Sequence, residues 1–346
     1  MNLLSAARSQ ARRRHIVALA VLGAGLAGAI VAGLLAGSVP MGANDILHAF
    51  AVNLGISDDP ERLTDSVLWA IRLPRVIGGA MVGAALGVTG AGLQGMYRNQ
   101  MADPQLLGIS AAAGLGAIAG IAVTPVGGPK IVSILGAAAA AIAAAWLMRK
   151  LARRVGESTQ FVLVGVAVGL ALVAWLGAIV LAWDDPRVPS FTFWVFGGLT
   201  NVTWSTLIAA VPLAVVGLAL VWAHAATLDL LALGDDQARH LGARVDRSRS
   251  FISAGVGLAV GAAVGIAGVV GFVGIVVPLL VRRVVGPGHS WLIALSGLGG
   301  AVSVVIVDIY ARTLASPAEI PLGLLTAAIG GPVFVWFLLT SGRFRT

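Results

Sequence analysis

The sequence contains no cysteine, and only 11% of its 346 residues are charged. The lack of cysteine excludes disulfide bonds and thiolate metal sites. A soluble domain usually has about 25% charged residues, whereas 58% of this chain is hydrophobic and its mean hydropathy is +0.95. A soluble fold leaves too much surface in water to hide so many apolar side chains. The composition therefore predicts an all-α integral membrane protein whose solvent is the bilayer.

Sequence motifs for several chemistries are also missing. No G-x-x-x-x-G-K-[ST] pattern occurs, so the chain is not expected to bind ATP through a P-loop. The stretch "GAGLAG" (23–28) matches a dinucleotide-binding pattern but lies within an apolar run with no preceding strand. The five histidines show no metal-ligand spacing. We therefore expect no metal site, no cofactor and no enzymatic activity in this chain.

Apolar runs long enough to cross a bilayer, about 20 residues each, are abundant. The sequence predicts roughly ten spans, near residues 16–37, 74–96, 106–124, 131–149, 161–183, 206–223, 250–268, 270–284, 291–311 and 320–340. The first run follows the basic stretch "ARSQARRRH", which also fits the start of a signal peptide. Its length and the spans that follow favour an uncleaved first span.

The distribution of charge predicts the orientation of these spans. When the N-terminus is placed in the cytoplasm and the spans alternate, most of the 23 Lys and Arg residues fall in cytoplasmic segments. Carboxylates such as Asp45, Asp65 and Glu319 then fall outside. The positive-inside rule thus accounts for the net charge of +8, and nucleic-acid binding is not expected. Ten spans place both termini in the cytoplasm.

A weak internal repeat supports a two-part plan within a single transmembrane domain, 1–346. The stretch "VGAALGVTG" (82–90) recurs as "VGAAVGIAG" (260–268), in a span of the opposite predicted direction. An inverted repeat of approximate halves 70–183 and 250–340 would fit a common plan of transporters. A chance match between Gly/Ala-rich helices is the alternative.

Three polar or aromatic segments interrupt the apolar chain. "RNQMADP" (98–104) is interpreted as a cytoplasmic turn in which Asp-Pro breaks the helix and the polar residues solvate exposed backbone. The aromatic-rich segment 184–205 is expected to be partly helical at the outer interface. Segment 224–249 is predicted to hold a short amphipathic helix around Leu228–Leu241 that does not span. That helix either lies on the membrane or docks a cytoplasmic partner.

The predicted spans hold almost no ionisable side chain. Asp308 is the one carboxylate near a span interior, and Arg312 follows it by one helical turn, which indicates a structural ion pair rather than a proton relay. Carriers driven by protons or sodium usually need such groups at the midplane. The energy for transport is therefore expected to come from another subunit.

Five motifs, in order along residues 70–340, carry a family resemblance. They are "RLPR" (72–75), "GLQGMYRNQMADPQLLGIS" (92–110), "LALGDDQARHLG" (231–242), "GFVGIVVPLLVRRVVGPGH" (271–289) and "DIYARTLASPAEIPLGLLTAAIGGPVFVWFLL" (308–339). Together they resemble the iron-complex and cobalamin permease family of bacterial ABC importers. The resemblance implies ten helices per subunit in the inner membrane and a pore formed with a second copy of the chain. It also implies two cytoplasmic ATPase subunits, which bind ATP and Mg, and an extracytoplasmic substrate-binding protein.

The resemblance also implies roles for particular residues. Arg72, Arg75 and Arg312 match family arginines at the outer mouth that pair with glutamates of the binding protein, with snorkelling to lipid headgroups as the alternative. Ser158 and Thr159, in "GESTQFVLVGVAVG" (156–169), match the cytoplasmic gate. Segment 224–249 matches the ATPase-coupling region, and a solvated face is the alternative. Its contact candidates are Asp235, Asp236, Gln237, Arg239 and His240.

The sequence therefore predicts the permease subunit of an ATP-driven importer. The stretch "ADPQLLGIS" is slightly more similar to haem and siderophore permeases, which favours an iron complex, either a ferric siderophore or haem. A cobalamin importer is the alternative within the family. A proton-coupled secondary carrier and a structural or assembly protein are the alternatives from other classes.

Overall fold

The computed structural model describes residues 2–37, 39–56, 63–126, 128–155, 159–183 and 185–341. The described residues form helices joined by turns, with no strand among them. The helices are α1 (Asn2–Leu35), α2 (Ala43–Asn53), α3 (Leu63–Val67), the π-helical η1 (Leu68–Arg72), α4 (Leu73–Met96), α5 (Ile109–Val123), α6 (Ile131–Val155), α7 (Thr159–Ala182), α8 (Phe191–Phe196), α9 (Trp204–Ala223), α10 (Ala225–Leu231), α11 (Asp235–His240), α12 (Val245–Ala267), α13 (Val273–Val285), α14 (His289–Thr313) and α15 (Leu322–Ser341).

A helix lies at each of the ten predicted spans, which confirms the expected all-α membrane architecture. Within the described residues, seven helical segments are long and apolar enough to cross a membrane. The shorter apolar helices α5 and α15 lie at the third and tenth predicted spans. The short helix α13 lies at the eighth, whose start the sequence placed three residues too early.

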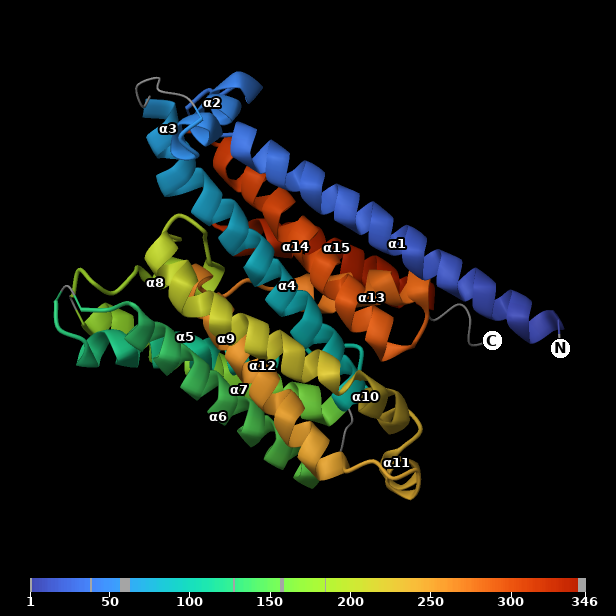
Figure 1. Ribbon diagram of the computed structural model, residues 1–346. Coiled ribbons are helices and arrows are strands. Elements are labelled where there is room, and N and C mark those ends of the chain that lie inside the picture. Colours follow the sequence, from blue (N-terminus) through green and yellow to red (C-terminus); the bar gives the residue numbers. More distant parts are fainter. Residues whose placement is uncertain are drawn as a thin grey trace.

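The helix ends gather into two groups at opposite ends of the bundle. One group, here the α8 end, holds α2, α3, α8, the start of α4 and the end of α14 (Figure 1). The other, here the α11 end, holds α10, α11 and the start of α12 (Figure 1). Trp204 at the start of α9 donates its indole N–H to the Trp69 carbonyl at the α8 end. This grouping follows the predicted alternation of the spans.

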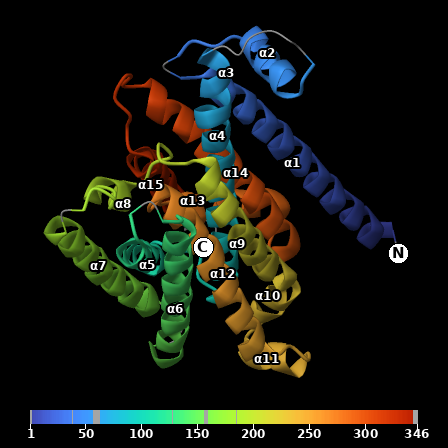
Figure 2. The same ribbon diagram turned by 60° about the vertical axis from the view of Figure 1, so that its left-hand side comes forward.

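Helices α4, α12 and α14 form the centre of the bundle. Helices α5, α6 and α7 lie on one side of this centre and α1 lies on the opposite side in both views (Figures 1 and 2). Small residues allow the central backbones to approach closely, as expected for packing in lipid. A Cβ added to Gly83 of α4 would lie 2.1 Å from the carbonyl oxygen of Gly300 in α14.

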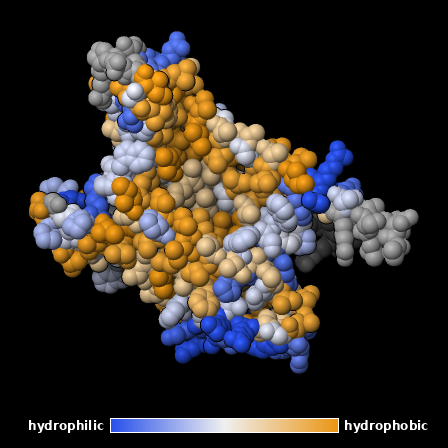
Figure 3. Space-filling view, viewed as in Figure 1, coloured by the Kyte–Doolittle hydropathy of each residue, from blue (hydrophilic) through white to orange (hydrophobic). Residues whose placement is uncertain are grey.

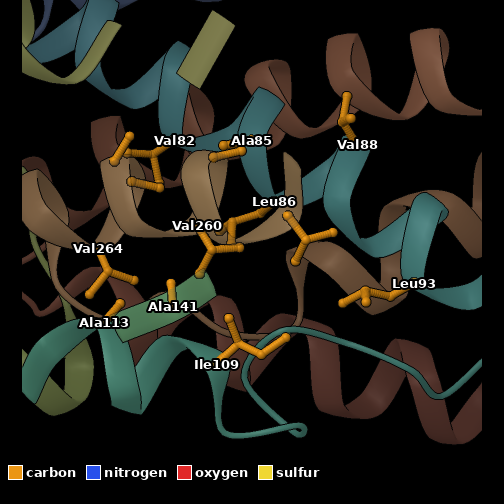
Figure 4. Close-up of a cluster of buried hydrophobic side chains, with 14 of the residues drawn as sticks. Val82, Ala85, Leu86, Val88, Leu93, Ile109, Ala113, Ala141, Val260 and Val264 are labelled. Atoms are coloured by element: carbon orange, nitrogen blue, oxygen red, sulfur yellow. The ribbon is translucent and has the colours of Figure 1, made fainter. Parts of the chain in front are cut away.

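The buried cluster between α4, α6 and α12 consists of small and branched side chains. Figure 4 shows Val82, Ala85 and Leu86 of α4 beside Val260 of α12 and Ala141 of α6. Both copies of the sequence repeat lie in these central helices, α4 and α12. Helix α4 runs from the α8 end to the α11 end and α12 runs the other way. Opposite directions are what an inverted repeat requires, and the division into halves stays a prediction.

The segment "RNQMADP" is only in part the exposed turn that the sequence predicted, because Arg98 and Gln100 are exposed but the residues after them are not. Ala102, Asp103 and Pro104 are buried, with Asp103 only 2% exposed. A Cβ added to Gly108 would lie 3.0 Å from backbone atoms of Gly169. Gly169 is ten residues into α7, a rise of about 15 Å along the helix. The chain therefore leaves α4 and turns back into the bundle before α5 begins.

This buried turn satisfies its own backbone, which explains why it does not need water. The Asp103 carboxylate accepts from the backbone N–H of Gln105 at 2.8 Å and of Leu106 at 3.4 Å. The Pro104 carbonyl accepts from the N–H groups of Ile109 at 2.9 Å and Ser110 at 3.2 Å. Irregular backbone is tolerated at membrane depth when protein groups meet its hydrogen-bonding needs.

The predicted amphipathic helix around Leu228–Leu241 is also wrong in detail, because the segment forms two short helices. Helix α10 ends at Leu231 and α11 begins at Asp235. Gly234, between them, has φ +112°, a conformation that glycine adopts at no steric cost and that ends a regular helix. The aromatic segment 184–205 contains α8, which confirms its predicted partial helicity.

Candidate functional site

Arg72 lies at the α8 end, at the last residue of η1, and is held by backbone carbonyls at the end of α1 and just after it. Its side chain donates to the carbonyl of Leu34 at 2.6 Å, of Leu35 at 2.9 Å and of Val39. The residue is 3% exposed. Three carbonyl acceptors stabilise a buried guanidinium by hydrogen bonding. Arg72 therefore joins the end of α1 to the start of α4.

Arg75 is the centre of a buried ion cluster one helical turn further along. Its Nε lies 3.0 and 3.1 Å from the two carboxylate oxygens of Asp308, and its Nη2 lies 2.8 Å from Asp308 Oδ1. Nη1 donates to Glu319 Oε1 at 2.8 Å and Nη2 to Glu319 Oε2 at 3.0 Å. The planar guanidinium thus grips two carboxylates, a geometry that a lysine cannot reproduce.

Arg312 completes the cluster from the other side of Asp308. Its Nε lies 3.4 Å from Asp308 Oδ2, which confirms the ion pair expected from their spacing. Its Nη2 donates to the carbonyl of Gly33 in α1 at 2.7 Å. Arg75 and Arg312 are 6% and 7% exposed. The cluster consequently ties α4 and α1 to α14.

Glu319 is the member of the cluster nearest to solvent. It lies in the connection between α14 and α15, its side chain is 36% exposed, and it accepts from Thr200 Oγ1 at 2.7 Å. Burial alone would raise the pKa of Glu319, but the hydrogen bonds from Arg75 and Thr200 outweigh it and lower the pKa from its usual value. A cavity of about 150 Å³ opens beside Arg75 and Glu319.

The sequence placed the three arginines at one end of the molecule, and the structure does the same. It does not present them as a free cationic patch, because all three are buried and engaged within the subunit. A docking role for them stays a prediction. Sequence reasoning missed the contribution of Glu319 and Thr200. The signal for Glu319 was available, since it follows Arg312 within the motif "DIYARTLASPAEIP".

A second and larger hollow lies at the α8 end. Its volume is about 680 Å³, and Lys130, Arg187, Trp194 and Asn201 are among the residues that line it. Arg187 pairs with Asp185 at 2.6 Å, whereas the side chain of Lys130 is exposed. The α8 end therefore combines buried arginines with an accessible cation at the surface.

At the α11 end, α11 is anchored at its first residue and otherwise exposed. The guanidinium of Arg249 in α12 donates to both carboxylate oxygens of Asp235 at 3.0 Å, and to the carbonyl of Met96 at 3.4 Å. The predicted contact residues split accordingly: Asp235 is half-buried, and the exposed ones are Asp236, Gln237, Arg239 and His240. Figure 3 shows a hydrophilic strip along this lower edge of the molecule.

Helix α10 is fastened to the start of α14 by one carboxylate. Asp229 accepts from the backbone N–H of His289 at 2.8 Å, and its Oδ1 lies 2.6 Å from His289 Nδ1. Sequence reasoning missed Asp229, His289 and Arg249, because nothing in their local pattern shows which distant segment each one meets. These contacts join α11 to α12 and α4, and α10 to α14.

The remaining predicted site lies largely outside the described residues. Ser158 is one of the residues that the structure does not describe, and Thr159 is the first residue of α7. The proposed gate therefore stays a prediction.

Among the described residues, no group of three or more His, Asp or Glu side chains could hold a metal ion.

Asp103 corrects the expectation that Asp308 is the one carboxylate inside the bundle. It is buried in the turn between α4 and α5 that enters the bundle. Its Oδ2 packs against Gly274 at the start of α13, where a Cβ added to the glycine would lie 2.4 Å from this oxygen. Gln94 of α4 donates to the Gly274 carbonyl at 3.2 Å. The carboxylate caps a turn and packs against α13, so its hydrogen bonds indicate a structural role.

Comparisons with known proteins show which proteins this chain is similar to. The model of the FecCD transport family matches residues 20–340. The hemin transport system permease protein HmuU of Yersinia pestis is 37% identical over 292 residues, covering 82% of this chain and 87% of the relative. The cobalamin import system permease protein BtuC of Halobacterium salinarum is 36% identical over 308 residues, covering 88% and 81%.

A solved structure shares the fold. It is described as an inward-facing conformation of a "metal-chelate type ABC transporter" and superimposes with a TM-score of 0.75. The superposition covers 94% of this chain and 99% of the other, at 24% sequence identity.

Proposed function

The chain belongs to the FecCD transport family, and on that premise we propose that it carries an iron complex, either a ferric siderophore or haem, into the cell. It is a multi-pass membrane permease subunit of a type II ABC importer, and a separate subunit hydrolyses ATP. We propose that this chain itself holds no cofactor and that ATP and Mg bind to the ATPase.

The observation that carries the substrate proposal is the 37% identity to a permease named for hemin. The 36% identity to a permease named for cobalamin supplies the alternative substrate. Both molecules are bulky metal complexes, which a wide pore with weak contacts can pass.

We further propose that the α11 end faces the cytoplasm of an inner-membrane importer, with both termini on that side. The excess of Lys and Arg in the segments at this end supports it. The exposed side chains of α11, anchored through Asp235 to Arg249, would receive the ATPase. The α8 end would receive the binding protein, and a second copy of the chain would complete the pore.

The proton-coupled carrier weighed from the sequence is not retained. Two sequence features argued against it, the lack of acids within the spans and the segment that resembles an ATPase-coupling region. The buried Asp103 removes the first of these arguments. Family membership decides the question instead, because a FecCD permease works with a separate ATPase.

The test is transport by the reconstituted importer. The chain, its ATPase and its binding protein are incorporated into vesicles, and ATP-dependent uptake of haem, a ferric siderophore and cobalamin is measured in parallel. Uptake of an iron complex that a tenfold excess of cobalamin does not reduce is the expected result. Uptake of cobalamin alone would establish cobalamin as the substrate. Uptake in vesicles that lack the ATPase would overturn the assignment as an ATP-driven importer.

A further inference from the structure

A groove at the α11 end lies between α1 and the pair α13 and α14. Its volume is about 870 Å³. Apolar side chains form most of its wall, and three arginines stand along it, Arg13 and Arg14 from α1 and Arg283 from α13. The apolar lining residues are Val17, Ala18, Val21, Leu22, Leu280, Val281, Val284, Val285 and Leu295.

The groove is a built feature of the bundle, because α1 is fixed beside it. His15 Nε2 lies 3.1 Å from the carbonyl oxygen of Val285, and the His15 ring stacks on Trp291 with the centroids 5.0 Å apart. Arg283 is oriented as well: its guanidinium lies 4.6 Å from the centroid of Phe337 and donates to Thr340 at 3.2 Å. Arg283 is therefore fixed beside the groove by α15, and Arg13 and Arg14 line the groove from α1.

The charge along the groove is of one sign. No Asp or Glu side chain lines it. Within the part of the chain that the structure describes, no ion pair joins Arg13, Arg14 or Arg283 to a carboxylate. Three neighbouring cations repel one another unless an anion lies between them. A ligand with an anionic head and long apolar chains would satisfy both the arginines and the wall.

We propose that this groove binds an anionic phospholipid, with its phosphate among Arg13, Arg14 and Arg283 and its acyl chains along the apolar wall. Basic pockets between membrane helices near the cytoplasmic surface recognise such headgroups. The location in the cytoplasmic leaflet rests on the proposed orientation, while the binding itself does not. A phosphate accepts charge-assisted hydrogen bonds from guanidinium groups. In a zwitterionic lipid the headgroup's own cation offsets the charge of the phosphate and weakens its attraction to the arginines.

A second copy of the chain fits the groove less well. A two-fold contact would bring the same face of both copies together, so it would gather the arginines of both grooves at one interface with no carboxylate from either groove to pair with them. Helix α1 also packs lightly against the rest of the chain, since only 11% of its apolar stretch is buried. A helix that exposes so much apolar surface is in contact with lipid, which supplies the ligand at high local concentration.

The experiment counts lipids retained by the purified full-length chain in native mass spectrometry. Phosphatidylglycerol and phosphatidylcholine with identical acyl chains are titrated separately, and the wild type is expected to retain one phosphatidylglycerol at concentrations where phosphatidylcholine is lost. Each arginine near a headgroup contributes about a fivefold change in affinity. The variant Arg13→Gln, Arg14→Gln, Arg283→Gln should lose on the order of a hundredfold.

A matched control removes three exposed cations at the same end but outside the groove, Arg12→Gln, Lys150→Gln and Arg154→Gln. It should bind phosphatidylglycerol like the wild type. If the triple groove variant does not fold, the double variant of Arg13 and Arg14 is measured instead. Equal loss of lipid by the control and the groove variant, or equal retention of the two lipids, would overturn the proposal.

Three further measurements test what occupies the groove. Val21→Trp fills the channel without changing charge, and Val21 is 64% exposed, so the core is not disturbed. It should reduce retention of phosphatidylglycerol, and unchanged retention would overturn the placement of the acyl chains.

Glycerol phosphate that binds as tightly as the lipid would show a simple anion site instead. A change in the dimer fraction of the groove variant, with lipid retention unaltered, would show a second copy as the occupant. All of these readouts are independent of transport, so the lipid site and the importer function can fail separately.

Discussion

Arg75 and Asp308 are 233 residues apart in the chain and meet through three short nitrogen–oxygen contacts in the interior. Arg75 lies near the start of α4 and Asp308 near the end of α14, so one ion pair joins helices from the two predicted halves. Removing one partner of a buried pair leaves an uncompensated charge, which is strongly destabilising. The pair therefore holds the α8 end together.

We expect Arg75→Ala to lower the stability of the detergent-solubilised protein by about 3–5 kcal/mol, because Asp308 would lose its main partner. Thermal unfolding followed by circular dichroism measures this loss. Lys130→Ala, which removes an exposed cation from the same end, should leave the melting temperature nearly unchanged. A wild-type melting temperature for Arg75→Ala, together with weaker binding-protein affinity, would show that Arg75 acts in docking and not in the fold.

Gly83 should not accept even one methyl group. A Cβ there would lie 2.1 Å from the Gly300 carbonyl oxygen, so α4 and α14 would have to separate. We expect Gly83→Ala to destabilise the protein by about 1–3 kcal/mol, the usual result of overpacking. Gly28→Ala is the control, since nothing lies within 4 Å of its added Cβ. Equal melting temperatures for the two variants would contradict the close approach of the helices.

Asp103 is expected to act through its hydrogen bonds rather than its charge. Asp103→Asn retains an oxygen that can accept from the N–H groups of Gln105 and Leu106. Asp103→Ala loses both bonds and should cost about 0.5–2 kcal/mol, the usual cost of removing a cap. Thermal unfolding and ATP-driven uptake should both rank Asn close to wild type and Ala below it. An Asn variant that is stable but inactive would assign the carboxylate a role in transport.

Arg239 is the exposed cation of α11, paired with Asp236 at 3.2 Å. We expect Arg239→Glu to weaken co-purification of the ATPase subunit while the chain still inserts, with the larger effect at low salt because the contact is electrostatic. Lys130→Glu makes the same charge change at the α8 end and should leave the ATPase bound. Unaltered association of the Arg239 variant at low salt would remove Arg239 from the interface.

Glu319 links the stability of the α8 end to pH. Its pKa is lower in the folded state than its usual value of 4.5, so the folded protein favours the charged form. The stabilising contribution is present above pH 4.5 and is lost as the pH falls through the lowered pKa. We expect Glu319→Gln to be modestly less stable than wild type at pH 7, and the two melting curves to converge in acid. Curves that stay parallel down to the lowest accessible pH would contradict this linkage.

The sequence by itself determined the class, the spans and the family. Apolar runs and small residues specify membrane helices through their local composition, and local composition is visible in a chain. The spacing of Asp308 and Arg312 likewise determined their ion pair, since residues four apart on a helix face one another. The motifs also placed Arg72, Arg75 and Arg312 at one end of the molecule.

Tertiary structure alone decided which of these polar groups are free. Arg75 is buried because Asp308 and Glu319 arrive from segments more than two hundred residues away. Asp103 turns inward because its carboxylate and the Pro104 carbonyl satisfy the backbone of the turn, which removes its need for water. The groove over Arg13, Arg14 and Arg283 exists because α1 packs beside α13 and α14. A pattern of residue types records what each side chain requires, whereas only the folded chain decides which distant group meets the requirement.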